Sequence, residues 1–230
     1  MLASAGAPLR DVAANLAAVR ERIARAADRA RRDPASIALV AVSKLHDADA
    51  IRAAYEAGQR RFGENYVQEL DEKVSALAAL AEIEWHFIGH LQRNKVKPVL
   101  RARPIVHTLD SARLADELAR RAPAAERVRV LIQVNVAREP QKAGVSPEDF
   151  DALLAHVRAL ASLELLGLMT IPPEAPPEEA RPHFRALREL AERHALRELS
   201  MGMSGDLEVA IEEGSTLVRV GTAIFGARAT

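Results

Sequence analysis

Short apolar runs and helical stretches alternate along almost the whole of this 230-residue chain. The apolar runs, which are typical of buried strands, cover residues 37–43, 61–63, 85–89, 105–109, 128–136, 163–169, 199–203 and 217–220. Sequences with helical periodicity lie between them, for example over 67–80, 111–121, 147–160 and 177–194. Strands that alternate with helices predict a parallel α/β sheet with right-handed crossovers.

The number of strand–helix units narrows the possible architectures further. Eight units close naturally into a (β/α)8 TIM-type barrel, and this length suits a single domain over residues 1–230 better than two ordinary domains. The alternative is an open, doubly wound sheet. Hydrophobic residues make up 49% of the chain, so a sizeable core can form without disulfides.

An extra amphipathic helix is predicted over about residues 8–32, ahead of the first strand. Apolar residues recur at helical spacing from Val12 to Ile23, and Asp33-Pro34 would end the helix. Six arginines lie between positions 20 and 32, but they are interleaved with apolar residues, so we interpret them as a solvated face. With 32 basic and 32 acidic residues, the chain lacks the basic excess typical of nucleic-acid binding.

Cysteine is absent from the sequence. Its absence excludes disulfides, a thiolate nucleophile and cysteine-ligated metal sites. No apolar run approaches the length of a membrane span, and the first ten residues lack the pattern of a signal peptide. We therefore expect a cytoplasmic protein that binds neither membranes nor nucleic acid.

Lys44 directly follows the first apolar run, and ligands of such barrels bind among the loops that follow the strands. An ammonium at the end of an apolar strand is poorly solvated, which lowers its pKa and exposes a nucleophilic amine. Such an amine can form a Schiff base with an aldehyde. Alternatively, Lys44 extends to solvent or pairs with a nearby acid.

Two clusters of glycine and hydroxyl residues follow the last two predicted strands. They are Gly202-Met-Ser-Gly205 and Gly221-Thr222. Glycine lets the backbone approach an anion and hydroxyls donate to it, and barrels often bind phosphate at these two loops. Neither GxGxxG nor a P-loop motif occurs, which argues against a dinucleotide or nucleoside triphosphate site.

Two further polar features lie within apolar strands. Arg219 requires a partner or a ligand there; one possibility is an ion pair with Glu208 or Glu212. His86 and His90 are four residues apart, but no third ligand is spaced to complete a metal site. We therefore predict no metal, and a hydrogen-bonded His86 in the barrel wall.

A series of short motifs runs in order between Leu39 and Gly226. They are Ala41-Val-Ser-Lys44, Phe62-Gly-Glu-Asn-Tyr66, Trp85-His-Phe-Ile-Gly89, Leu91-Gln92, Asn94-Lys95, His107-Thr-Leu-Asp110, Leu199-Ser-Met-Gly-Met-Ser204 with Asp206, Val218-Arg-Val-Gly-Thr222 and Phe225-Gly226. Together they resemble the pyridoxal phosphate homeostasis protein family, also called the YggS or proline synthase co-transcribed family. Two details depart from its pattern: Leu45-His46-Asp47 follows the lysine, and Arg93 replaces a usual serine.

The resemblance implies a fold-type III barrel like the N-terminal domain of alanine racemase, with pyridoxal 5′-phosphate (PLP) in Schiff-base linkage to Lys44. Arg219 would face the pyridine nitrogen, and Asn65 would lie beside the ring. The phosphate would be held by Ser204, Gly221 and Thr222. The departures at positions 45–47 and 93 touch none of these groups.

The resemblance also implies a role in PLP (vitamin B6) homeostasis rather than catalytic turnover. An arginine cannot accept a proton, so the ring nitrogen facing it would stay neutral and the ring would be a weak electron sink. Racemisation tolerates this but needs a second base, for which Tyr66 is the candidate. We therefore expect a monomeric PLP carrier that can supply apo forms of PLP-dependent enzymes, with a racemase-like enzyme as the alternative.

Overall fold

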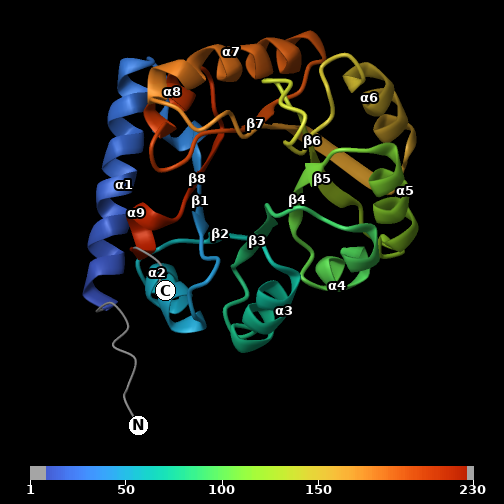
Figure 1. Ribbon diagram of the computed structural model, residues 1–230. Coiled ribbons are helices and arrows are strands. Elements are labelled where there is room, and N and C mark those ends of the chain that lie inside the picture. Colours follow the sequence, from blue (N-terminus) through green and yellow to red (C-terminus); the bar gives the residue numbers. More distant parts are fainter. Residues whose placement is uncertain (1–8, 227–230) are drawn as a thin grey trace.

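The computed structural model describes residues 9–226, in which eight parallel strands close into a barrel (Figure 1). The strands are β1 Ala38–Val42, β2 Arg61–Glu64, β3 Glu84–Phe87, β4 Ile105–Leu109, β5 Val128–Gln133, β6 Leu163–Met169, β7 Glu198–Ser200 and β8 Leu217–Val220. They follow chain order around the barrel, and β8 pairs with β1 to close it. This closure confirms the predicted TIM-type barrel and excludes an open sheet.

Helices surround the barrel and connect successive strands (Figure 1). They are α1 Leu9–Arg29, α2 Ala48–Glu56, α3 Val67–Ala76, α4 Val96–Arg101, α5 Ala112–Arg121, α6 Phe150–Ala159, α7 Pro177–Arg193, α8 Leu207–Glu212 and α9 Thr222–Phe225, with 3-10 helices η1 Pro34–Ser36 and η2 Arg93–Lys95. Asp47 caps α2 by accepting a hydrogen bond from the backbone N–H of Ala50. The helices α4, α8 and α9 span six, six and four residues, too few for a helical period to identify them in the sequence.

The predicted extra helix, α1, packs on the outside of the barrel beside α2, α8 and α9 (Figure 1). The prediction that its arginines form a solvated face is wrong in part. Arg22 forms an ion pair with Glu208 of α8, and Arg20 and Arg32 donate to backbone carbonyls of neighbouring segments. These arginines flank the buried apolar stripe, so their long side chains reach across to adjacent helices.

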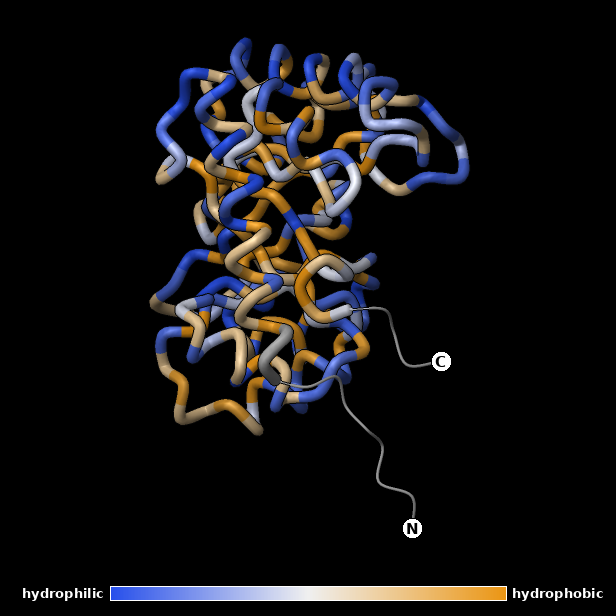
Figure 2. Tube along the Cα trace, turned by 90° about the vertical axis from the view of Figure 1, so that its left-hand side faces the viewer, coloured by the Kyte–Doolittle hydropathy of each residue, from blue (hydrophilic) through white to orange (hydrophobic). Residues whose placement is uncertain are grey.

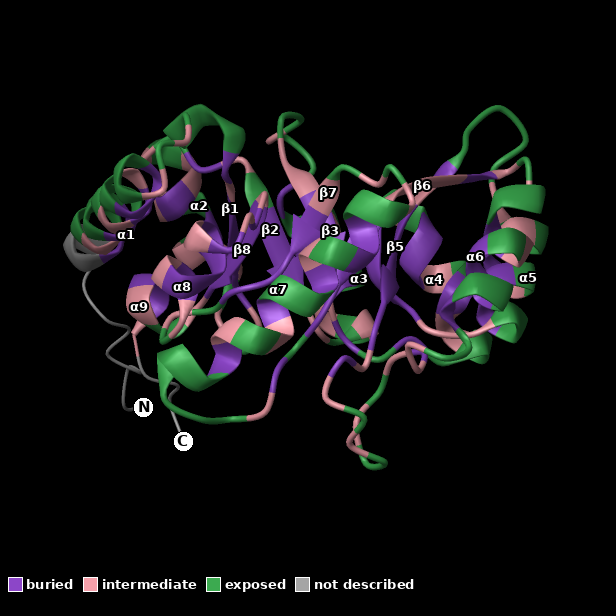
Figure 3. Ribbon diagram, turned by 90° about the horizontal axis from the view of Figure 1, so that it is seen from above, coloured by how far each residue is buried: buried purple, intermediate pink, exposed green. Residues whose placement is uncertain are grey.

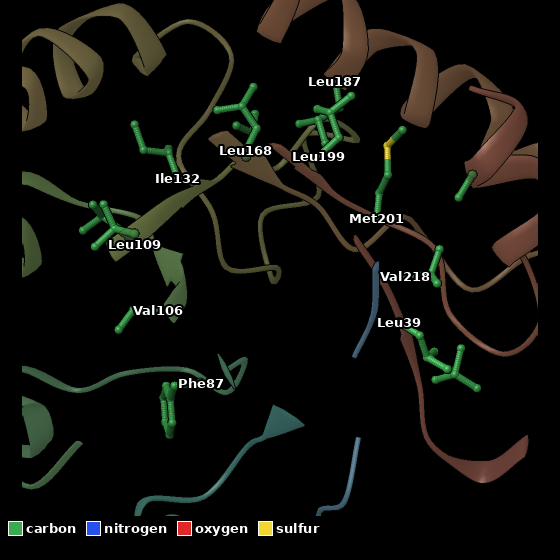
Figure 4. Close-up of a cluster of buried hydrophobic side chains, with 14 of the residues drawn as sticks. Leu39, Phe87, Val106, Leu109, Ile132, Leu168, Leu187, Leu199, Met201 and Val218 are labelled. Carbon is green, nitrogen blue, oxygen red and sulfur yellow. The ribbon is translucent and has the colours of Figure 1, made fainter. Parts of the chain in front are cut away.

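Apolar side chains fill two regions, one on each side of the strands, because successive residues of a strand face opposite ways. Outside the barrel, Leu187 of α7 faces Leu168 and Leu199 of the strands beneath it (Figure 4). The smaller cluster inside the barrel consists of Val40, Ile105, Leu131, Met169 and Leu217. The interior is therefore a packed core rather than a channel.

Exposure rises from the strands to the outer faces of the helices and the loops. Buried segments concentrate in the strands, and exposed ones on the outer helix faces (Figure 3). Hydrophobic stretches likewise run through the middle of the chain trace, and the loop that projects to the right is hydrophilic (Figure 2). Within residues 9–226, no helix has both the length and the apolar character needed to cross a membrane.

Candidate functional site

Three of the predicted site residues follow the adjacent strands β1 and β8, which pair in parallel. Lys44 is half-buried in the turn directly after β1, whereas Gly221 follows β8 and Thr222 begins α9. A Cβ at Gly221 would lie 3.1 Å from the carbonyl oxygen of Val42. The small glycine therefore allows these two strand ends to approach closely.

The remaining predicted residues come from β8 itself and from the strands on either side. Asn65 follows β2, which pairs with the other edge of β1. Ser204 follows β7, and the backbone N–H of Arg219 in β8 donates to the carbonyl of Gly202 in the same loop, at 2.9 Å. The structure thus brings all six predicted residues to the carboxyl ends of four neighbouring strands, β7, β8, β1 and β2.

A buried ion network, here called the wall network (Ser43, Glu64, Glu69 and Lys73), supports the turn after β1. Nζ of Lys73 in α3 lies 2.8 Å from Oε1 of Glu64, from Oε2 of Glu69 and from the carbonyl oxygen of Ser43. Oγ of Ser43 donates to Oε1 of Glu64 at 2.6 Å, and the backbone N–H of Leu45 donates to Glu69 at 2.7 Å. Both chain neighbours of the predicted Schiff-base lysine are therefore tied to α3.

Burial dominates the electrostatics of the wall network. Desolvation raises the pKa of the fully buried Glu64, although Lys73 and Ser43 partly offset this effect. For Glu69, burial also acts to raise the pKa, but hydrogen bonds from Lys73 and the Leu45 N–H bring the net shift below the usual value. The sequence interpretation missed this network; the only local signal was the four-residue spacing of Glu69 and Lys73 on a helix.

Arg219 is buried inside the barrel, with 4% of its surface exposed. Its Nη1 donates to Oγ of Ser200 at 2.6 Å, and its Nη2 donates to the carbonyl of Thr170 at 2.9 Å. Desolvation lowers the pKa of the guanidinium to about 10, so it stays charged at neutral pH. The alternative of an ion pair with Glu208 or Glu212 is wrong, because those carboxylates pair with arginines of α1 and α7.

Hydrogen bonds lead from Arg219 through Ser200 and His107 to His86 in the barrel interior, and a close contact joins His86 to Glu84. We call these five residues the inner chain. Nδ1 of His107 lies 2.9 Å from Oγ of Ser200, and its Nε2 lies 2.8 Å from Nδ1 of His86. Nε2 of His86 lies 3.3 Å from Oε1 of Glu84 at the start of β3. Desolvation lowers the pKa of both fully buried histidines. The predicted hydrogen-bonded His86 is confirmed.

The loop after β7 is held from two sides. Nη2 of Arg22 in α1 donates to the carbonyl of Ser204 at 2.9 Å, and Oδ1 of Asp206 accepts from the backbone N–H of Met203 at 2.6 Å. Apart from its chain neighbours, a Cβ built at Gly205 would meet no atom of residues 9–226 within 4 Å. The loop is thus fixed by α1 and by its own side chains while leaving open space beside Gly205.

Asn65 carries an unsatisfied polar atom. Its Oδ1 is buried and has no hydrogen-bond partner among residues 9–226. A Cβ at Gly89, in the loop after β3, would lie 1.9 Å from the carbonyl oxygen of Asn65, so the two loops meet through a contact that requires glycine. Leaving a buried acceptor unpaired costs about 1–3 kcal/mol, which a donor on a bound ligand would recover.

The two histidines considered for a metal site serve different purposes. His86 belongs to the inner chain, whereas His90 is exposed. In the part of the chain that the structure describes, no group of three His, Asp or Glu side chains is arranged to hold a metal ion.

Comparison with known proteins identifies the family of this chain. The family model for the alanine racemase N-terminal domain matches residues 14–229. The chain is 47% identical over 221 residues to the pyridoxal phosphate homeostasis protein of Aquifex aeolicus, covering 93% of this chain and 96% of that protein. It belongs to the pyridoxal phosphate homeostasis protein family. The family member from Pseudomonas aeruginosa is 48% identical over 222 residues, covering 94% of this chain and 96% of that protein.

Solved structures of similar proteins share this barrel. PipY of Synechococcus elongatus, solved with PLP bound, is 38% identical with a TM-score of 0.82, covering 94% of this chain and all of that chain. Alanine racemase from Corynebacterium glutamicum is 18% identical with a TM-score of 0.71, covering 96% of this chain but 62% of the racemase. The second likeness shows the fold alone. The family and fold recognised from the sequence motifs are therefore confirmed.

Proposed function

We propose that this member of the pyridoxal phosphate homeostasis family holds PLP through a Schiff base with Lys44 and acts as a non-catalytic PLP carrier. The observation that carries the proposal is the position of Lys44 on the rim of the barrel, at the end of a strand paired with the one that buries the charged Arg219. Its relatives are named as PLP homeostasis proteins, and PipY binds PLP.

The groups on this rim fit the chemistry of PLP. When bound, PLP supplies an aldehyde that reacts with amines and an aromatic ring that withdraws electrons. Lys44 offers the amine, Arg219 offers donors for the pyridine nitrogen, and the buried Oδ1 of Asn65 offers an unused acceptor. The phosphate would be held by Ser204, Gly221 and Thr222.

The properties of Arg219 favour a carrier over an enzyme. A guanidinium with a pKa of about 10 is fully protonated at neutral pH, so it can donate a hydrogen bond to the ring nitrogen but accepts no proton to pass on. Ring protonation is therefore disfavoured, and reactions that need a strong electron sink become slow. We propose that the protein is a cytoplasmic monomer and passes PLP to apo forms of PLP-dependent enzymes.

A racemase-like enzyme is the second candidate, and Tyr66 is the observation that favours it. Tyr66 precedes α3 on the same rim and is 50% exposed, so its phenol could act as a base on the ring face opposite Lys44. Such a base must be within hydrogen-bond reach of the substrate proton. A racemase would need the Tyr66 phenol for turnover, whereas a carrier would not.

Borohydride reduction of the PLP-loaded protein followed by peptide mapping tests the Schiff base. We expect the pyridoxyl group on Lys44, and loss of visible absorption in Lys44→Ala but not in the matched Lys97→Ala, whose side chain is exposed on α4. A label on Lys73, Lys95, Lys97 or Lys142 instead would contradict the assignment.

A transfer assay separates the two functions. The loaded protein is mixed with an excess of an apo PLP-dependent enzyme, and reactivation of that enzyme is followed beside a racemisation assay over the common amino acids. We expect reactivation without racemisation. Robust racemisation that Tyr66→Phe abolishes would identify an enzyme and refute the carrier.

A further inference from the structure

The inner chain has a definite hydrogen-bond direction that begins at Arg219. A guanidinium only donates, so Oγ of Ser200 must accept from Nη1 of Arg219 at 2.6 Å. The serine hydroxyl has one proton of its own, and Nδ1 of His107 lies 2.9 Å from Oγ. When Ser200 donates this proton to His107, Nδ1 of His107 is an acceptor and the neutral ring carries its proton on Nε2.

The same logic fixes the second histidine. Nε2–H of His107 donates to Nδ1 of His86 at 2.8 Å, which leaves the proton of a neutral His86 on its Nε2. That atom is buried and lies 3.3 Å from Oε1 of Glu84, an ionic contact at a distance longer than the other links of the chain, and it makes no hydrogen bond to any of residues 9–226. The opposite direction would turn a bare nitrogen lone pair of His86 toward a carboxylate and leave the Ser200 proton without an acceptor.

Glu84 is a fixed negative charge at the far end of this chain. Its carboxylate accepts from Nε of Arg61 at 3.0 Å and from Nη1 of Arg129 at 2.8 Å. The contact with His86, together with these arginines, holds the pKa of Glu84 well below its usual range despite partial burial. The inner chain therefore connects a buried cation in β8 to a carboxylate at the amino end of β3 through neutral groups alone.

We propose that Ser200, His107, His86 and Glu84 form a polarised relay that positions Arg219 toward bound PLP. Aligned dipoles extending to Glu84 add to the attraction of Asp206 in stabilising the buried charge of Arg219, which forms no direct ion pair with a carboxylate among residues 9–226. The guanidinium then keeps one orientation and its full donor strength toward the ring nitrogen. This inference rests on the proposed function, because PLP is the group that Arg219 would face.

Histidine tautomers in the protein without PLP test the relay directly. In ¹⁵N NMR spectra of the histidine-labelled protein, we expect both His86 and His107 to be neutral with the proton on Nε2. A proton on Nδ1 of His107, or an imidazolium at neutral pH, would overturn the relay. In Ser200→Ala, the Nδ1 resonance of His107 should shift because its hydrogen-bond donor is removed.

Ser215 provides the matched control. It is fully buried, like Ser200, but its Oγ donates to backbone carbonyls, including that of Met201 at 2.7 Å. Removing a bond to a charged group should weaken PLP binding about tenfold in Ser200→Ala and shift its visible absorption maximum, whereas Ser215→Ala should change neither. Identical behaviour of the two variants in both measurements would refute the relay.

The two sets of measurements keep the relay and the proposed function apart. If the unaltered protein does not bind PLP, the proposed function fails. The tautomers of His86 and His107 in the PLP-free protein still decide whether the hydrogen bonds run in the inferred direction.

Discussion

The wall network and the inner chain both contain charged groups in this barrel, but the charges contact each other directly in the first and are separated by neutral groups in the second. In the wall network the charged groups touch, since Nζ of Lys73 lies 2.8 Å from carboxylate oxygens of both Glu64 and Glu69. In the inner chain, Arg219 and Glu84 are separated by a serine and two neutral histidines. One network lies between the strands and α3, and the other lies inside the barrel.

The difference corresponds to two separate demands of the candidate site. Direct ion pairs are rigid, so the wall network suits the task of holding the backbone on both sides of Lys44. A carboxylate touching Arg219 would satisfy the donors that the ring nitrogen of PLP would need. Because the neutral serine and histidines lie between Arg219 and Glu84, the guanidinium is linked to a negative charge without losing those donors. Three predictions test this contrast between the two networks.

The largest effect is expected from breaking the wall network. Lys73→Met leaves Glu64 buried without its cation, which should lower the free energy of unfolding by about 3–5 kcal/mol in urea denaturation. The double change Lys73→Met with Glu64→Leu removes both charges and should recover much of this loss.

Lys97→Met is the control for this experiment, because Lys97 is exposed in α4 and should change stability by no more than about 0.5 kcal/mol. A Lys73→Met protein as stable as the control would show that the wall network contributes nothing to the fold.

A smaller effect should appear in the pH dependence of stability. Burial lowers the pKa of His86 and His107, so below about pH 6.5 the unfolded chain binds protons that the folded protein does not. The free energy of unfolding should therefore fall as the pH drops from 6.5 to 5.5, by up to about 1.4 kcal/mol for each histidine. Above pH 6.5 both states hold neutral rings, and this contribution is constant.

His107→Asn should flatten that slope, as measured by urea denaturation at pH 7.5, 6.5 and 5.5. His90→Asn, which replaces an exposed histidine, is the matched control. An unchanged slope in His107→Asn would mean that His107 takes up a proton in the folded protein, in conflict with a neutral inner chain.

The smallest effect is expected where both partners of an ion pair are exposed. Arg25 and Glu21 of α1 lie 2.8 Å apart, but each side chain is more than half exposed. Arg25→Ala should lower the free energy of unfolding by about 0.3–0.5 kcal/mol in low salt, and the loss should vanish in 1 M NaCl because ions screen the pair. If Arg25→Ala lost as much stability as Lys73→Met, burial could not explain the difference between the exposed and the buried ion pair.

The sequence predicted the parts of this structure that depend on local pattern. Apolar runs defined the strands, and a lone charge after or within such a run marked Lys44 and Arg219. The partners of Arg219 were not predictable in this way, because Ser200 and Thr170 approach it only through the barrel closure and the registers of β6, β7 and β8. The α1 arginines were misjudged for the same reason, since their acceptors lie on helices distant in sequence.

The open space beside Gly205 gives the molecule a practical use as an optical sensor. The chain contains no cysteine, so Gly205→Cys would create a unique thiol for a maleimide dye. Within the described part of the chain, a Cβ at this position contacts only its chain neighbours. The dye would sit next to Ser204 in the loop proposed to hold phosphate. Its emission could then report cofactor loading and release in real time, without any reliance on the colour of PLP itself.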